Sequence, residues 1–203
     1  MEGIVFVISG PAGVGKTTLC DRLLSEFPSK LRRVVTATTR KPREGEVDGV
    51  DYHFLAKKDF LEQVNEGAFV EYELVHQNLY GTQKNALLVL HGEARQHDLL
   101  LNVDVNGASS LKKFSQDNTF LRGSVFSVFV LPSSIHELRD RLTQRGSDNQ
   151  AEIETRLKTA EREIDRKDQF DYVLPSTGRD ADYQRLKDYY LSCSNNPKDE
   201  RKD

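Results

Sequence analysis

A glycine-rich turn between an apolar run and a helical pattern constrains this chain more than any other feature. Residues 4–8 (IVFVI) form an apolar run typical of a buried strand, and residues 16–25 place Leu19 and Leu23 on one helical face. Between them, residues 10–17 read GPAGVGKT and match the pattern G-x-x-x-x-G-K-[ST]. Because the match leaves a strand and enters a helix, it predicts the strand–turn–helix start of an α/β fold.

The residue types of this turn suit a phosphate group. Glycines let backbone N–H groups turn inward without Cβ clashes, and the next helix offers its positive N-terminal end. Lys16 can reach the β- and γ-phosphates of a nucleoside triphosphate, and the Thr17 hydroxyl can ligate Mg²⁺. The bland alternative is a glycine-rich turn with an exposed lysine, and the strand–helix context disfavours it. The ATP-binding residues expected here are Gly10, Pro11, Ala12, Gly13, Val14, Gly15, Lys16, Thr17 and Thr18.

Strand-like and helix-like segments alternate along the rest of the chain. The patterns predict strands at 33–38, 69–75, 99–103, 125–131 and 172–174 and helices at 59–66, 83–91, 134–145, 151–165 and 182–191. Such alternation favours a parallel sheet wrapped by helices. The 203 residues suit one domain, expected at 1–193, with a disordered polar tail at 194–203.

Composition narrows the possible functions. The net charge of −3 argues against a general nucleic-acid or membrane binder. The two cysteines lie far apart and the five histidines are scattered, so we expect free thiols and no metal cluster. The apolar run at 4–8 is too short for a signal peptide or a membrane span, which predicts a cytoplasmic protein.

A second cluster of charged residues follows the strand predicted at 33–38. Residues 36–46 read TATTRKPREGE and residues 49–54 read GVDYHF. Arg40 and Arg43, in a loop restrained by proline, make a fork-shaped anion site, and the hydroxyl of Tyr52 can donate a further hydrogen bond. Taken alone, such a cluster is more often a solvated charged loop.

Together with the glycine-rich turn, this cluster resembles the guanylate kinase family. That family carries S-x-T-T-R-x-P-R-x-G-E-x-x-G-x-D-Y-x-F, and this chain departs from it only in Thr36, which replaces serine. The resemblance extends from about residue 4 to 172. It implies transfer of the γ-phosphoryl of ATP to GMP or dGMP, with Mg²⁺, in a P-loop fold with a GMP-binding arm at about 36–82 and a lid at about 134–158.

The resemblance also implies roles for single residues. Arg40, Arg43, Tyr52 and Tyr80 would hold the GMP phosphate. Glu71, Thr82 and Asp104 would contact guanine, with the Thr36 hydroxyl acting where the family has serine. An ionised Glu71 only accepts hydrogen bonds, so it suits the two donors of guanine, N1–H and the N2 amino group, and repels the N1 acceptor of adenine. The alternatives are an exposed strand carboxylate for Glu71, a helix N-cap for Thr82 and plain packing for Tyr80.

Arginines near the predicted lid complete the expected site. Arg141 and Arg145 lie four residues apart on one helix, and Arg156 lies on the next. Solvated helix charges are the bland alternative. In the family pattern, Arg141 and Arg145 bind ATP. Lys16, Arg40, Arg43, Arg145 and Arg156 would neutralise the charge of phosphoryl transfer, with water excluded and no side-chain nucleophile.

Two departures from the family pattern stand out. The family has D-x-D where this chain has Asn102-Val103-Asp104, and Asn102 can hydrogen-bond water around Mg²⁺ but brings no charge, so its metal role stays open. Residues 174–177 (LPST) replace a V-N-D-like segment that meets adenine. Two other functions stay as alternatives: a kinase for thymidylate or adenylate, and a non-catalytic guanylate-kinase-like module that binds phosphopeptides. The oligomeric state stays open.

Overall fold

The core of the protein is a five-stranded parallel sheet. The computed structural model describes residues 3–75, 77–93, 97–119, 121–145 and 149–195, without the side chains of residues 89–93 and 145. The strands run in the order β2-β7-β1-β8-β9, and each pairs in parallel with its neighbour. Their bounds are Leu31–Arg33 for β2, Asp98–Asn102 for β7, Val5–Ser9 for β1, Val125–Leu131 for β8 and Tyr172–Pro175 for β9. The predicted parallel sheet is confirmed.

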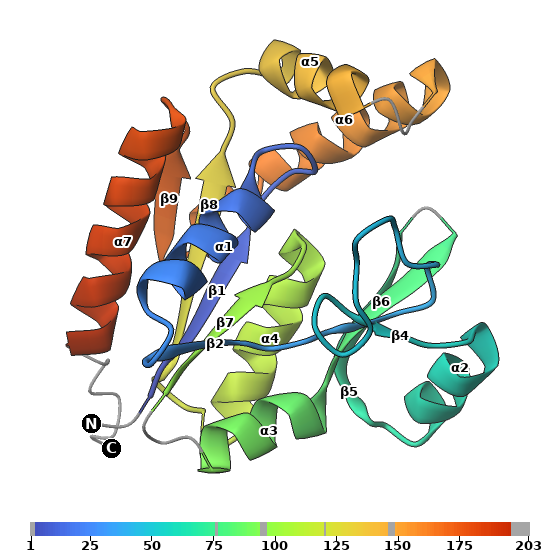
Figure 1. Ribbon diagram of the computed structural model, residues 1–203, viewed down its shortest axis with the longest axis vertical. Coiled ribbons are helices and arrows are strands. Elements are labelled where there is room, and N and C mark those ends of the chain that lie inside the picture. The colour runs from blue at the N-terminus through green and yellow to red at the C-terminus, as the bar shows by residue number, and fades with distance from the viewer. Residues whose placement is uncertain (1–2, 76, 94–96, 120, 146–148, 196–203) are drawn as a thin grey trace.

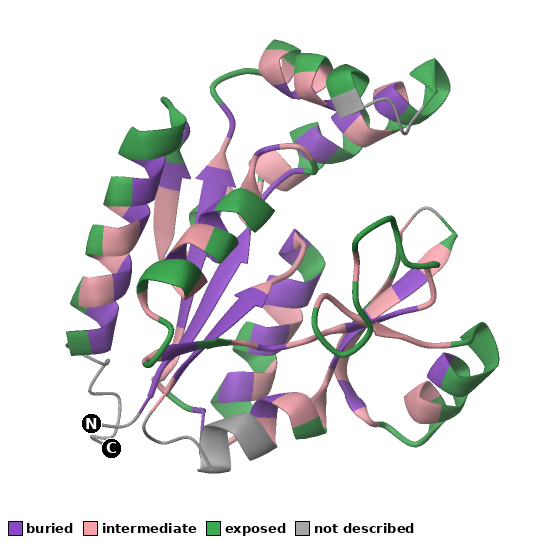
Figure 2. Cartoon of the chain, viewed as in Figure 1, coloured by how far each residue is buried: buried purple, intermediate pink, exposed green. Residues whose placement is uncertain are grey.

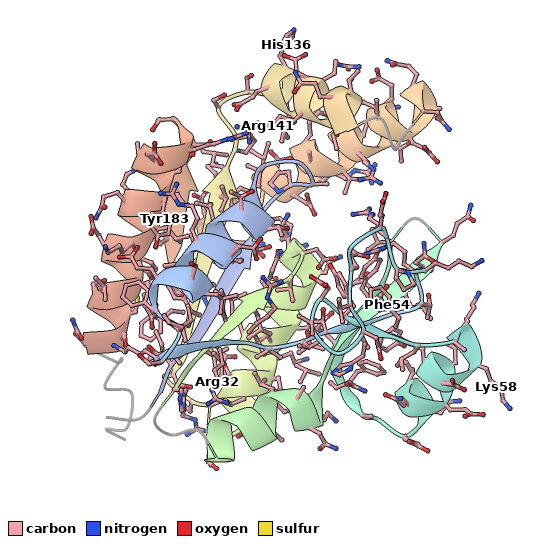
Figure 3. All side chains as sticks on the ribbon, viewed as in Figure 1. Arg32, Phe54, Lys58, His136, Arg141 and Tyr183 are labelled. Carbon is pink, nitrogen blue, oxygen red and sulfur yellow. The ribbon has the colours of Figure 1, made fainter. Side chains whose placement is uncertain are left out.

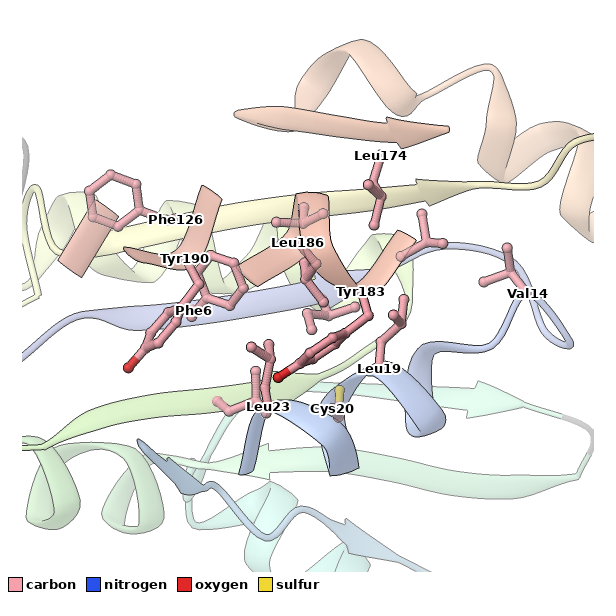
Figure 4. Packing of buried hydrophobic residues seen from close by; sticks show 14 of the residues in the cluster. Phe6, Val14, Leu19, Cys20, Leu23, Phe126, Leu174, Tyr183, Leu186 and Tyr190 are labelled. Atoms are coloured by element: carbon pink, nitrogen blue, oxygen red, sulfur yellow. The ribbon is translucent and has the colours of Figure 1, made fainter. Parts of the chain in front are cut away.

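Helices cover both faces of this sheet, because alternate residues of the buried strands point to opposite sides. On one face, Phe6 packs with α1 (Lys16–Glu26) and α7 (Arg179–Asn195), whose Leu23 and Tyr190 are fully buried (Figure 4). On the other face, Val7 packs in a cluster with residues of α3 (Lys84–Glu93) and α4 (Val105–Asp117), among them Leu111. Figure 2 shows the strands of the core as its most continuously buried part.

Residues 37–83 leave the core between β2 and α3 and form a separate lobe, called the arm below (Figure 1). It holds a second sheet in the order β4-β3-β6-β5, with β3 antiparallel to β6 and β6 antiparallel to β5. The bounds are Ala37–Thr38 for β3, His53–Phe54 for β4, Lys57–Asn65 for α2, Phe69–Val75 for β5 and Asn78–Gln83 for β6. Phe60 and Phe69 stack at 4.4 Å between ring centroids in the small core of the arm.

Two helices, α5 (Ile135–Arg145) and α6 (Gln150–Ile164), rise beyond the end of the core sheet that bears the glycine-rich turn (Figure 1). The Ser134 hydroxyl accepts a hydrogen bond from the Glu137 N–H and so caps the start of α5. Asn149 and Glu152 form a complete capping box at the start of α6. A salt bridge between Arg139 and Glu154 joins the pair, called the lid helices below.

Five elements differ from the sequence predictions, among them the short strand β4, which was not predicted. The segment predicted as one strand at 33–38 is divided between β2 in the core sheet and β3 in the arm. Strand β6 and helix α4 were not predicted. Helix α7 starts at Arg179 and extends to Asn195, beyond the predicted 182–191, so the start of the predicted tail is wrong: Ser194 is buried and donates to Asp98 at 2.7 Å. Residues 196–203 lie outside the described residues. A short 3-10 helix spans Lys167–Gln169, and within the described part of the chain no helix is long and apolar enough to cross a membrane.

Candidate functional site

The glycine-rich turn joins the end of β1 to the start of α1. Gly10, Gly13 and Gly15 have φ values of 133°, 88° and 106°, a region that side chains disfavour. A Cβ atom on Gly10 would lie 2.6 Å from the carbonyl oxygen of Val130. Gly15 is the N-cap of α1 and Ala12 is exposed at the top of the turn. The turn therefore has the backbone conformation that phosphate-binding loops need.

Lys16 lies against the turn that precedes it. Its ammonium group donates to the carbonyl oxygens of Gly10 and Pro11, the latter at 3.0 Å. Thr17 and Thr18, in the first turn of α1, are exposed. A cation and two hydroxyls thus surround the N-terminal end of a helix, a site suited to a polyphosphate.

Helix α5 covers the same turn. Arg141 donates to the carbonyl oxygen of Val14 at 2.9 Å and forms an ion pair with Glu137 (Figure 3). Leu142 packs against Gly13. The structure therefore brings Arg141 to the glycine-rich turn, 127 residues away in sequence.

The other two lid arginines are placed less fully. Arg145 is the last residue of α5, and its side chain lies outside the described residues. Arg156 is half-buried on α6, one residue before the buried Leu157. The structure therefore places the side chain of Arg156 on the lid helices, but for Arg145 it places only the backbone.

The predicted acceptor-phosphate residues gather in the arm. Arg40 donates from Nε to the hydroxyl of Tyr80 at 3.2 Å, and its guanidinium lies 5.5 Å from the centroid of the Tyr52 ring. Tyr52 and Tyr80 meet edge-on at 6.0 Å between ring centroids. The side chain of Arg43 is exposed on the loop that follows. The structure thus brings Arg40, Tyr52 and Tyr80 together on one cationic, hydroxyl-bearing surface, and Arg43 lies on the loop beside it.

The predicted base-binding residues meet where the arm touches the core. Glu71 in β5 lies opposite Thr82 in β6, and the Thr82 hydroxyl donates to its carboxylate at 2.6 Å. The carboxylate also lies against Gly107 in the first turn of α4. Burial, chiefly, together with the charges of Asp104 and Glu73, raises the pKa of Glu71 to about 7, although the hydrogen bonds with Thr82 oppose the shift.

The non-functional interpretations of Glu71 and Thr82 are wrong. Glu71 is not an exposed strand carboxylate, because it is largely enclosed. Thr82 is not a helix N-cap, because it lies in β6 and is 1% exposed. Tyr80 is bonded through its hydroxyl to Arg40, so it does more than pack.

Asp104, Asn102 and Thr36 lie at the junction between core and arm. Asp104 is the N-cap of α4 and accepts from the Gly107 N–H at 2.7 Å. Asn102, the last residue of β7, lines a cavity of about 20 Å³ together with Thr36 and Tyr52. Tyr52 from the arm and Asn102 from the end of the core sheet therefore line the same small pocket.

Three further residues in the site were not predicted. Gly107 is close to the Glu71 carboxylate, and Glu46 bonds Arg40 through both oxygens. Glu163 in α6 has a pKa raised to about 7, mainly by burial and further by Asp104, while Lys16 and Arg166 lower it. The spacing of Arg156, Ala160 and Glu163 puts them on one helical face, which was a usable signal for Glu163.

Known proteins match almost the whole chain. A sequence model of the family described as guanylate kinase matches residues 3–192. A guanylate kinase from Syntrophotalea carbinolica is 45% identical over 175 residues, 85% of this chain and 78% of that protein. One from Nitratidesulfovibrio vulgaris is 40% identical and spans 97% of this chain and 90% of its own. A crystal structure of guanylate kinase from Anaplasma phagocytophilum superposes with a TM-score of 0.76 at 26% identity, over 98% of this chain and 91% of that one. The chain therefore belongs to the guanylate kinase family.

Proposed function

We propose that this protein transfers the γ-phosphoryl of ATP to GMP. The observation that carries the proposal is the enclosed Glu71 carboxylate, bonded to Thr82 and set at the first turn of α4. An ionised carboxylate there accepts from N1–H and the N2 amino group of guanine together, whereas adenine presents an acceptor at N1. A site built on paired polar groups rejects an analogue that leaves them unpaired.

The acceptor phosphate is assigned to the arm and the donor phosphates to the core. Arg40, Arg43, Tyr52 and Tyr80 supply cationic and hydroxyl groups for GMP. For ATP, the glycine-rich turn and Lys16 surround the β- and γ-phosphates, and Arg141 rests on the same turn from above. Because the sugar 2′-OH is not what these groups recognise, we extend the proposal to dGMP.

Transfer needs no nucleophilic side chain. An oxygen of the GMP phosphate attacks the γ-phosphorus in line, and the bond to the β–γ bridging oxygen breaks. Lys16, Arg40, Arg43, Arg145 and Arg156 offset the negative charge in the transition state. Closure of the arm and of the lid helices over the core excludes water, which would otherwise accept the phosphoryl group.

The residues present also fit Mg²⁺ that arrives with ATP. Thr17 is exposed at the start of α1, and Asn102 ends β7, the strand beside β1. Both supply oxygen atoms, which Mg²⁺ prefers, and Asn102 suits a water-mediated contact. Within the described residues no group of three or more His, Cys, Asp or Glu side chains could hold a metal. When bound, Mg²⁺ would neutralise charge on the polyphosphate.

The adenine contact differs from the family pattern. The hydroxyl of Ser176 donates to Asp182 at 2.7 Å, and the backbone N–H of Thr177 donates to the same carboxylate at 2.8 Å. These groups are therefore committed to α7. We assign adenine recognition to other groups and expect weaker selection of ATP over GTP as donor than of GMP over AMP as acceptor.

Release of ADP with ATP, Mg²⁺ and a panel of nucleoside monophosphates tests the proposal. GMP and dGMP should give the largest kcat/KM values, and AMP and dTMP should be poor acceptors. Preference for AMP or dTMP would identify a different nucleotide kinase. ADP release that no nucleotide stimulates, together with tight binding of a phosphopeptide, would identify a non-catalytic module. The intact glycine-rich turn and Lys16 disfavour that outcome.

A further inference from the structure

Glu46 is bonded to both arginines of the acceptor loop. Its two carboxylate oxygens accept from Nη1 and Nη2 of Arg40, each at 2.9 Å, in a bidentate pair. One of these oxygens also accepts from the backbone N–H of Arg43 at 2.7 Å. Only 14% of the Arg40 side chain and 19% of the Glu46 side chain are exposed. The pair is therefore shielded from competing water far more than an ordinary surface salt bridge.

These contacts largely fix the guanidinium of Arg40. Nε donates to the Tyr80 hydroxyl at 3.2 Å, and Nη1 donates to the carbonyl oxygen of Lys41 at 2.7 Å as well as to Glu46. A guanidinium carries five N–H donors, and these contacts use four of them. The aromatic ring of Phe54 lies under the group at 5.8 Å. Arg40 therefore offers an incoming phosphate its remaining Nη2 donor and its charge in a fixed direction.

Glu46 is itself held by the turn that carries Arg43. The backbone N–H of Glu46 donates to the carbonyl oxygen of Arg43 at 3.1 Å, while the Arg43 N–H donates to the Glu46 side chain. Each residue thus restrains the other. The strong pairing with Arg40 keeps the pKa of Glu46 below its ordinary value, so the carboxylate is charged throughout the neutral range.

We propose that Glu46 is a positioning residue for the acceptor phosphate, because it orients Arg40 through both oxygens and closes the turn that presents Arg43. This inference rests on the proposed function. It predicts an unusual effect on affinity: Glu46 is an anion beside an anion-binding site, yet it strengthens phosphate binding. A carboxylate that only competed with the phosphate for Arg40 would do the opposite.

Glu46→Gln tests whether Glu46 strengthens or weakens the binding of the GMP phosphate. The amide keeps the shape but turns one hydrogen-bond acceptor into a donor facing the guanidinium. We expect the KM for GMP to rise at least about tenfold, because hydrogen bonds to charged groups contribute that much. The KM for ATP should hold within twofold. Glu46→Asp, which keeps the charge and shortens the reach, should recover part of the loss.

Glu44→Gln is the matched control. Glu44 is exposed on the same loop, and its replacement removes the same charge two residues away. The KM for GMP should stay the same or fall slightly in this variant. A second measurement compares GMP with guanosine, which lacks the phosphate: Glu46→Gln should weaken GMP binding and leave inhibition by guanosine unchanged.

Three results would overturn the proposal. A lower KM for GMP in Glu46→Gln would make Glu46 a competitor of the phosphate, and an unchanged KM would leave it without a role. Equal losses for GMP and guanosine would point to general damage of the arm. The wild-type assay with GMP tests the proposed function separately, so failure of the Glu46 inference alone leaves that function standing.

Discussion

Acidification should release GMP through Glu71. Binding of guanine needs the ionised carboxylate, and burial raises the pKa of Glu71 in the free protein to about 7. At pH 6 only about one molecule in ten then has the ionised form, against about three in four at pH 7.5. The apparent Kd for guanine should therefore rise roughly eightfold between pH 7.5 and 6, a change of about 1.3 kcal/mol. A group with an ordinary glutamate pKa would change this Kd by less than about 10% over the same range.

The assay must separate Glu71 from the phosphate of GMP, which also takes up a proton near pH 6. Guanosine lacks that phosphate, so its inhibition constant reports the base site alone. Calorimetry in two buffers of different ionisation enthalpy should show release of nearly one proton per guanosine bound at pH 6. Glu71→Gln should bind weakly with a flat pH profile. A wild-type inhibition constant that does not change between pH 6 and 8 would refute this account of the base site.

Four other expectations concern separate parts of the protein. Lys16→Ala should reduce kcat by about 1,000-fold or more, as loss of a transition-state charge contact does, while the Kd for GMP is retained; normal turnover would exclude the glycine-rich turn from catalysis. Gly107→Ala should raise the KM for GMP severalfold, because its Cβ would lie 3.2 Å from the Glu71 carboxylate, and the thermal midpoint should hold because alanine favours a helix by about 1 kcal/mol. The free energy of unfolding should fall as pH rises from about 4.5 to 7, because Glu71 and Glu163 keep their protons in the native state over this range but lose them in the unfolded state. Glu71→Gln and Glu163→Gln should each remove part of this fall, at most about 3 kcal/mol per variant. Hydrogen exchange should show protection of the arm with GMP and of the lid helices with an ATP analogue, and unchanged exchange with both ligands would favour a rigid site.

Local patterns were enough for the core sheet. Strand β8 was predicted with its observed bounds, because a short apolar run flanked by polar residues is typical of a strand buried in a parallel sheet. Strand β6 was missed because NLYGTQ is polar and carries Gly81, so its strand conformation depends on pairing with β5. Helix α4 was missed because Gly107, Ser109 and Ser110 weaken the helical pattern, although Asp104 caps it.

The division of residues 33–38 between two sheets shows a different limit. Both halves favour extended structure, and the chain changes partners between them: the Val34 N–H donates to Leu100 in the core, whereas Ala37 pairs with Gly81 in the arm. Propensity describes the backbone conformation but not the neighbour, so the sequence could not locate this passage.

In the site, too, contiguous residues could be assigned from the sequence, whereas contacts between distant segments could not. The phosphate-binding turn is contiguous, and its residues could be assigned from their order alone. The pairing of Glu71 with Thr82 needs a hairpin that was not predicted, and the seat of Arg141 on the Val14 carbonyl needs the whole lid to fold. The resemblance to a family named Glu71, Thr82 and Arg141 as site residues but predicted neither contact. The surroundings of Glu46 and Glu163 are likewise visible only in the folded structure.

The buried carboxylate of Asp98 ties together three distant parts of the chain. It accepts from the backbone N–H of Ile4 at 2.9 Å and from the hydroxyls of Tyr190 and Ser194, each at 2.7 Å. During synthesis β1 and β7 emerge before α7, so this carboxylate lacks two of its donors until α7 has been made. A buried acceptor without its donors is costly. Strand β1, which carries the phosphate-binding turn, can therefore pair with β7 and β8 early, but the carboxylate that anchors its start gains its last two donors only with α7.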